Sequence, residues 1–128
     1  MRRVVLLPVV LLAFVLAGCG SSKSYSIADT RACLEARGVH TGGTLDDFVA
    51  STATGGAFVA VLGDNSVKIV FGETEDDARQ LESAYGRFAF ENVKAGLPDV
   101  LRRYGNAVTL WHEHPQDSDL ALITGCLE

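Results

Sequence analysis

Two histidines, in the run His112-Glu113-His114, are the side chains best placed to do chemistry together. In a β-strand alternate residues point to the same side, so His112 and His114 could bind zinc or copper, with His40 or a carboxylate completing the site. The pair lacks the four-residue spacing of a helical zinc-protease motif, and Pro115 suits solvated residues at the end of a strand. We therefore predict no metal site and no cofactor.

Three other patterns of reactive residues lack an element that their chemistry needs. No serine lies in the Gly-x-Ser-x-Gly turn of a serine hydrolase, and the glycine-rich segments 42–44 and 54–56 are not followed by the Lys-Ser/Thr of a phosphate-binding loop. The acidic segment 73–77 lacks the glycine and alternating ligands of a calcium loop, and it suits the start of a helix. We therefore predict that the protein is not an enzyme, with a small hydrolase as one alternative.

The N-terminal segment has the pattern of an export signal. Two arginines precede an apolar run over residues 4–16, which is too short to cross a bilayer. The run ends in Leu16-Ala17-Gly18-Cys19, which resembles the lipobox of bacterial lipoproteins. This resemblance implies that the thiol of Cys19 receives a diacylglyceryl group and that the chain is cut just before it. In composition and plan the chain also resembles the small lipoproteins of actinobacteria, a likeness that implies no activity.

The resemblance divides the chain into a signal peptide at residues 1–18, a lipidated tether at residues 19–25 and a single domain at residues 26–128. It implies a location at the extracytoplasmic face of the cell membrane, because two acyl chains suffice for stable anchoring. Cleavage removes two of eleven basic residues and none of sixteen acidic ones, so the formal charge changes from −5 to −7. We expect this charge to repel nucleic acid and anionic lipid, so that the lipid anchor alone holds the protein at the membrane.

The use of Cys19 by the anchor leaves Cys33 and Cys126 as a pair. In the oxidising compartment that the resemblance implies, such a pair is expected to form a disulfide. A closed loop of about 90 residues contributes about 4.6 kcal/mol in the chain-entropy model. The alternative, a redox-active or metal-binding thiol pair, lacks the Cys-x-x-Cys spacing that tunes a thiolate.

Two helices are predicted from their start signals. Ser26 and Asp29 form a capping pattern for a helix over residues 27–37, which Gly38 ends. Thr74 begins a second helix that runs to about residue 91 or 94. Within it an apolar stripe is expected to face a sheet. The stripe consists of Ala78, Leu81, Tyr85 and Phe88.

The predicted sheet has four strands. In chain order they lie at residues 57–62, 66–71, 107–112 and 120–127. The first two flank Gly63-Asp64-Asn65, which is typical of a hairpin turn, and residues 99–104 are expected to form a helical turn. The order αββαββ predicts an α+β fold, a two-layer sandwich whose four-stranded sheet carries both helices on one face.

The disulfide would orient this sheet, since Cys126 on the last strand can reach a helical Cys33 only from the face that carries the helices. Because side chains alternate along a strand, the opposite face is expected to be open and apolar. Its residues are Val59, Val61, Val70, Trp111 and Ile123. Alternatively, the loop over residues 39–56 folds across this face and buries the same side chains.

These observations predict a membrane-anchored extracytoplasmic lipoprotein that acts as a non-catalytic binding module. We expect the open face to bind a protein partner or a second copy of the chain. Trp111 would be its energetic centre, with Val59, Val61 and Ile123 around it, because aromatic side chains dominate interface energies. An envelope protein that binds metal through His112 and His114 is the alternative function.

Overall fold

The computed structural model describes residues 23–127. The predicted signal peptide at residues 1–18, the lipidated Cys19 and most of the predicted tether lie outside the described residues. Within residues 23–127, no helix is both long enough and apolar enough to cross a membrane.

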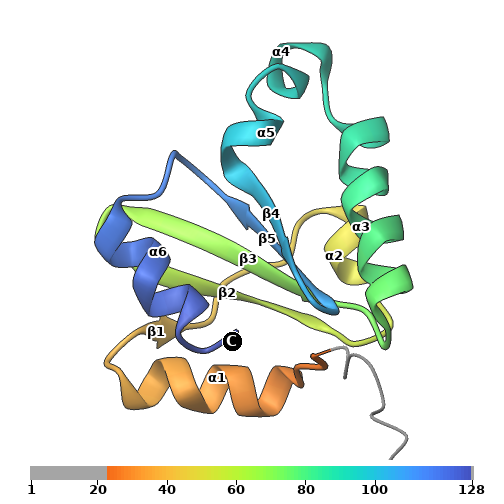
Figure 1. Ribbon diagram of the computed structural model, residues 1–128. Coiled ribbons are helices and arrows are strands. Elements are labelled where there is room, and N and C mark those ends of the chain that lie inside the picture. The colour runs from red at the N-terminus through yellow and green to blue at the C-terminus, as the bar shows by residue number, and fades with distance from the viewer. Residues whose placement is uncertain (1–22, 128) are drawn as a thin grey trace, which may run out of the picture.

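The described part of the chain forms one five-stranded antiparallel sheet and six helices, which confirms the α+β class (Figure 1). The helices are α1 (Ile27–Ala36), α2 (Phe48–Ser51), α3 (Glu75–Phe88), α4 (Glu91–Lys94), α5 (Leu97–Val100) and α6 (Asp117–Thr124). The strands are β1 (His40–Thr41), β2 (Ala57–Leu62), β3 (Asn65–Phe71), β4 (Leu101–Tyr104) and β5 (Ala107–Trp111). They lie in the order β1-β2-β3-β5-β4, so the predicted four strands and αββαββ order are wrong.

The first helix and the hairpin form where their local signals predict them. The hydroxyl of Ser26 accepts a hydrogen bond of 3.1 Å from the backbone N–H of Asp29, which caps α1. Gly38 follows with φ of +81°, a backbone conformation that favours glycine. Between β2 and β3, Gly63 turns the chain with φ of +60°. These turns depend on residues close in sequence, which is why the sequence predicts them.

The start of α3 is also confirmed, but its end is not. Thr74 and Asp77 form a reciprocal capping box, in which each side chain accepts a hydrogen bond from the other residue's backbone N–H. The helix ends at Phe88 rather than at residue 91 or 94, because Ala89 adopts an extended conformation with ψ of 143°. The remaining turn of predicted helix is the separate, short α4.

The C-terminal third of the chain corrects two predictions. The predicted strand over residues 120–127 is mainly helix α6, whose first turn carries Asp117 and Asp119, and acidic side chains stabilise a helix start. Of the predicted helical turn over residues 99–104, only residues 99 and 100 are helical, at the end of α5. The other four form the edge strand β4, which pairs with β5 around Gly105 at φ of +53°. Short apolar runs fit either structure, so their pattern could not decide between helix and strand.

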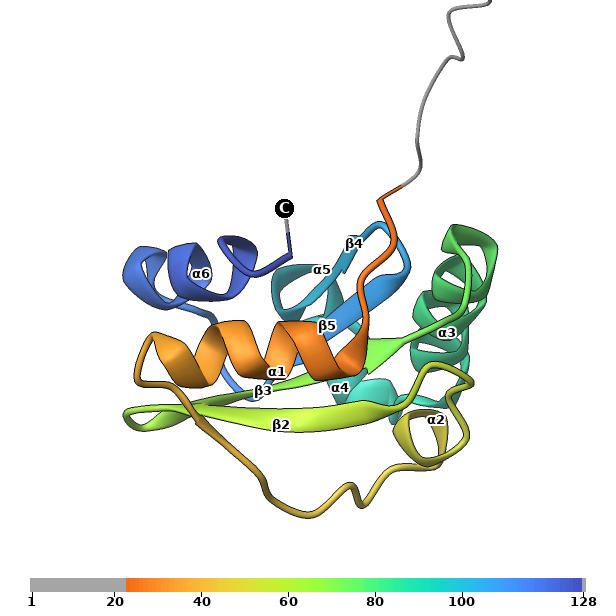
Figure 2. The same cartoon turned by 90° about the horizontal axis from the view of Figure 1, so that it is seen from below.

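Helices cover both faces of the sheet, so the prediction of both helices on one face is wrong. Helices α1 and α6 lie on one side and α2 on the other (Figure 2). Helix α3 packs with α2, since both contribute to one apolar cluster with Val70 and Val108. The larger cluster, under α1 and α6, includes Leu34, Phe58, Ile69, Phe71, Trp111 and Ile123. We call these two sides the α1/α6 face and the α2/α3 face.

Two ties close the α1/α6 face. Cys33 of α1 and Cys126, just after α6, form the predicted disulfide, with Cα atoms 5.8 Å apart. The buried side chain of Asn106 accepts a 2.6 Å hydrogen bond from the backbone N–H of Tyr25 and donates to the carbonyls of Tyr25 and Gly72. The last residue of the predicted tether, Tyr25, is therefore already held against the domain.

Candidate functional site

The predicted open face is not open. Trp111 is 2% exposed and Ile123 is fully buried, so the predicted exposure of these two side chains is wrong. Trp111 pairs with Val67 and Val67 with Ala60, and residues opposite each other in a sheet share a face. Trp111 therefore points to the α1/α6 face, where α6 brings Ile123 down onto it.

The other members of the predicted surface lie on the opposite side of the sheet. Val70 is fully buried in the cluster under α2 and α3. A Cβ atom at Gly43 would lie 3.5 Å from the side chain of Val59, so the loop after β1 crosses this strand. Val61 keeps 38% of its surface exposed. The alternative of a covering loop thus holds for Val59, and the predicted face is divided between two sides.

The histidines do not converge on a metal site. His112 and His114 are exposed, and Nδ1 of His114 lies 2.6 Å from a carboxylate oxygen of Asp99. His40 lies in β1, at the far edge of the sheet from β4. Among residues 23–127, no group of three or more His, Cys, Asp or Glu side chains could hold a metal ion. Metal binding by His112 and His114 therefore gains no support from the geometry.

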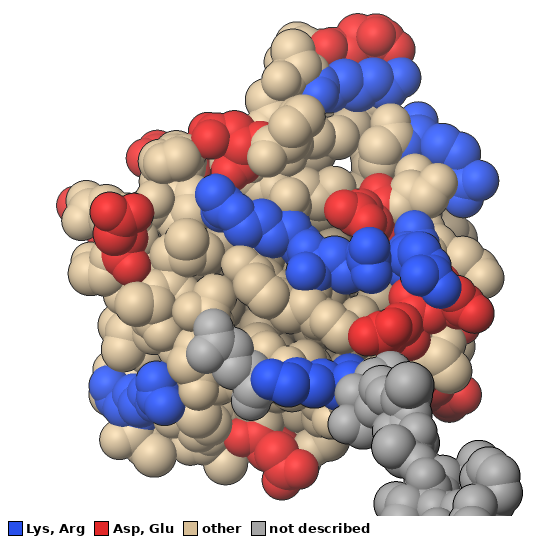
Figure 3. Space-filling model, viewed as in Figure 1, with Lys and Arg blue, Asp and Glu red and all other residues tan. Residues whose placement is uncertain are grey.

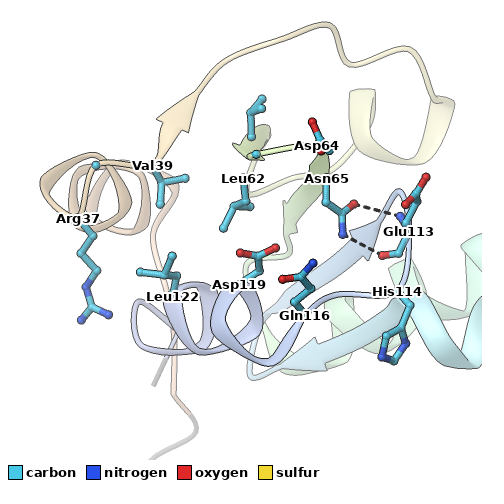
Figure 4. Close-up of a pocket in the computed structure, with 13 residues that line it drawn as sticks. Arg37, Val39, Leu62, Asp64, Asn65, Glu113, His114, Gln116, Asp119 and Leu122 are labelled. Atoms are coloured by element: carbon cyan, nitrogen blue, oxygen red, sulfur yellow. Dashed lines mark hydrogen bonds between the residues drawn. The ribbon is translucent and has the colours of Figure 1, made fainter.

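A polar pocket of about 620 Å³ lies between the end of α1, the β2–β3 turn and the start of α6 (Figure 4). Asp119 and Gln116 project from the α6 region toward Leu62 and Asn65, whereas Arg37 and His114 point away. The side chain of Asn65 exchanges hydrogen bonds with the backbone of Glu113 and so ties two walls of the pocket together. A carboxylate in a polar hollow does not define a ligand, so we assign this pocket no function.

The α1/α6 side of the surface is mixed in charge. Acidic and basic side chains are interspersed, with basic ones crossing the middle of the view over β4 (Figure 3). Strand β4 contributes Arg102 and Arg103, and Nε of Arg103 donates a 3.0 Å hydrogen bond to Glu82. Interspersed charge is ordinary for a solvated face.

Exposed aromatic side chains distinguish the α2/α3 face. Phe48 is 72% exposed at the first position of α2, and Phe88 is 67% exposed at the last position of α3. Both line a groove of about 300 Å³ between the two helices, which we call the aromatic groove. Its other lining residues are Val49, Thr52, Ala53, Thr54, Asp77, Gln80, Leu81, Ala84 and Arg87. Two large aromatic side chains thus flank a partly apolar hollow.

The exposure of Phe88 overturns the prediction that it faces the sheet. Ala78 is fully buried and Tyr85 is 7% exposed, as the stripe predicts. At 100° per residue, the ten residues from Ala78 to Phe88 turn the side chain about 80° away from the direction of Ala78. Phe88 therefore lies at the margin of the stripe, where its side chain lines the groove and does not reach the sheet.

Asp47 holds the groove in shape. One carboxylate oxygen accepts hydrogen bonds of 2.7 Å from the backbone N–H of Ala50 and 3.1 Å from the hydroxyl of Tyr85. The other accepts a 2.6 Å hydrogen bond from Nζ of Lys68 on β3. A single side chain thus caps α2 and joins it to α3 and to the sheet. Phe48, the next residue, is consequently displayed from a fixed backbone.

The electrostatics of this cluster agree with its geometry. Burial raises the pKa of Tyr85 above its ordinary value of 10.0, and the nearby charge of Asp47 raises it further. Burial lowers the pKa of Lys68, but its hydrogen bonds and charge interactions with Asp46 and Asp47 together leave that pKa above 10.5. Both effects favour a neutral phenol and a charged ammonium beside Asp47.

Sequence reasoning missed the groove because Phe48 lies in a segment expected to be mostly loop. One usable signal was present. Asp47 is a good N-cap residue, and its carboxylate accepts from the backbone N–H of Ala50 three residues later. An aromatic residue directly after such a cap lies in the first turn of a helix, and this could have indicated that Phe48 projects from a fixed backbone.

Comparison with protein-family models, with curated proteins and with solved structures finds no match to this chain. The groove must therefore be interpreted from its own geometry.

Proposed function

We propose that this protein is a membrane-anchored extracytoplasmic lipoprotein that acts as a non-catalytic interaction module and binds a protein partner through the aromatic groove. The anchor rests on the Leu16-Ala17-Gly18-Cys19 motif, which lies outside the described residues. The observation that carries the binding is the pair of exposed aromatic rings, Phe48 and Phe88, beside one groove.

The energetics favour occupation of this groove. Fully burying a phenylalanine side chain contributes about 1.5–3 kcal/mol, so rings that remain two-thirds exposed each offer about 1–2 kcal/mol to a partner. Aromatic side chains displayed by a rigid backbone lose little conformational entropy on binding. Asp47 supplies that rigidity, because it joins α2 to α3 and to the sheet.

The position of the groove is compatible with anchoring. Lys23 and Ser24, the first described residues, lie beside Gly125 and Cys126 on the α1/α6 side. The α2 end of the groove lies on the other side of the sheet (Figure 2). An anchor attached ahead of Lys23 therefore leaves the groove free to meet a partner.

Site-specific photocrosslinking of the full chain in intact cells tests the proposal. A photoreactive residue replaces Phe48 or Phe88, and the matched control replaces Ala121, an exposed residue of α6 on the other face. We expect a discrete protein adduct from positions 48 and 88, lost from position 48 when Phe88→Ser is added. An equal adduct from position 121, or none from the groove, would reject the proposal.

A further inference from the structure

We infer that the partner bound by the aromatic groove is a second copy of this chain, related by a two-fold axis that sets the two α3 helices antiparallel. The inference rests on the proposed function, since it names the occupant of the same groove. Its two supports are the shape of the groove and the placement of charge along it.

The groove region is self-complementary in shape. A two-fold interface joins the same patch of both subunits, so that patch must provide both a projection and a hollow. Phe48 and Phe88 project, and the hollow of about 300 Å³ lies between the helices that carry them. Each copy can thus insert a ring into the other.

The α3 side of the groove has an apolar centre and charged ends. Its lining residues recur three and four positions apart along one side of the helix, which is the spacing of a helix-packing stripe. Leu81 and Ala84, both partly buried, form the middle of this stripe. The small side chain of Ala84 allows a close approach of a second helix. An apolar centre with a polar rim is the usual anatomy of a protein interface.

The charges at the two ends select the antiparallel arrangement. Asp77 lies near the start of α3 and Arg87 near its end, and both line the groove. Ten residues of helix separate them by about 15 Å. A two-fold axis perpendicular to α3, near its midpoint, brings Asp77 of each copy opposite Arg87 of the other. A parallel arrangement would set like charges together, which disfavours it.

The test uses the full chain in intact cells, with two copies that carry different epitope tags and a photoreactive residue at position 48. We expect an adduct of twice the subunit mass that contains both tags. Arg87→Asp should reduce this adduct about tenfold, because at both symmetry-related contacts the new carboxylate at position 87 then faces the carboxylate of Asp77. Asp77→Arg should do the same. Co-expression of the two variants under different tags should restore the mixed adduct alone, because every facing pair is again of opposite sign.

Asp77→Arg also removes the α3 capping box, so a second measurement uses two cysteine variants that leave the capping box intact. Ala84→Cys places a thiol near the proposed axis, whereas Ser83→Cys places a thiol at an exposed neighbouring position that lines a different hollow. Oxidation should give a covalent dimer of Ala84→Cys and little of Ser83→Cys. Equal yields from the two variants would overturn the inference.

The outcomes separate this inference from the proposed function. An adduct of a different mass from position 48 would overturn the second copy and leave the groove as an interaction site. A double-mass adduct that Arg87→Asp leaves unchanged would overturn the antiparallel arrangement. No adduct from position 48 or 88 would overturn both proposals.

Discussion

The two faces of the sheet are covered in different ways. On the α1/α6 face, a helix of ten residues and one of eight cover a large apolar cluster, and a disulfide joins them. On the α2/α3 face, the fourteen-residue α3 is accompanied by a helix of only four residues, which Asp47 holds, and β3 presents the charged Lys68. The first arrangement buries Phe58, Phe71 and Trp111, whereas the second buries Tyr85 but leaves Phe48 and Phe88 exposed. Stability is therefore expected to depend more on the first face, and binding to depend on the second.

The largest expected effect is loss of the disulfide on the α1/α6 face. Cys33 and Cys126 are 93 residues apart, and a loop of that length contributes about 4.6 kcal/mol in the chain-entropy model. Replacing both residues by serine should lower the free energy of unfolding by roughly that amount, as measured by urea denaturation. Reductant should destabilise the native protein similarly and leave the double variant unchanged. A loss below about 1 kcal/mol would contradict the importance of this tie.

Truncation of Trp111 is expected to cause the next largest loss of unfolding free energy. The side chain is 2% exposed, so Trp111→Ala should cost about 3–5 kcal/mol of stability through the cavity it leaves. Trp111→Phe should cost much less, since the indole N–H has no hydrogen-bond partner in the described part of the chain. Phe48→Ala is the contrasting variant on the other face and should change stability by less than about 0.5 kcal/mol. Equal losses from Trp111→Ala and Phe48→Ala in denaturation curves would erase the distinction between the faces.

Removal of the Asp47 carboxylate should have an intermediate effect. Asp47→Ala deletes the cap of α2 and leaves the hydroxyl of Tyr85 and the ammonium of Lys68 without this acceptor, which should cost about 2 kcal/mol. Asp46→Ala is the matched control, because Asp46 pairs with the same lysine but its side chain is 75% exposed. We expect the control to lose less than about 0.5 kcal/mol in the same denaturation assay. Similar losses in both variants would show that Asp47 has no special role.

The smallest expected effect is a dependence of stability on alkaline pH. The folded-state pKa values of Lys68 and Tyr85 are both raised above their ordinary values of 10.5 and 10.0. A group with a raised pKa contributes stability that is fully present below its unfolded pKa and declines as pH rises above it. Stability should therefore fall from about pH 10 upward. The double variant Lys68→Met with Tyr85→Phe should reduce the decline of the unfolding free energy above about pH 10. An unchanged decline in this variant would show that other groups cause it.

The local parts of the fold could be read from the sequence. The caps at Ser26 and Thr74 and the turn at Gly63 involve residues within a few positions of one another, so their chemistry is visible in the chain. The Cys33–Cys126 pairing followed because the lipobox resemblance implies that Cys19 carries the lipid, which leaves two cysteines to pair. The alternation of side chains along β2 is also a local property, and it sets Phe58, Ala60 and Leu62 together on a buried face.

The candidate site could not be read in the same way. Residues 120–127 carry an apolar run that suits a strand or a helix, and only packing against the sheet decides for α6. That one choice moved Ile123 from a predicted open face into the core. Phe48 and Phe88 are forty residues apart, and the hydrogen bonds of Asp47 bring their helices together only in the folded chain.

The sequence by itself determined where several elements begin, where the main hairpin turns and which cysteines pair, because each depends on local chemistry or on composition. The tertiary structure alone decided which face of the sheet each helix covers and which aromatic rings remain in solvent. The physical reason is that burial is a property of the assembled layers. An apolar side chain has the same chemistry whether the next layer covers it or stops short of it.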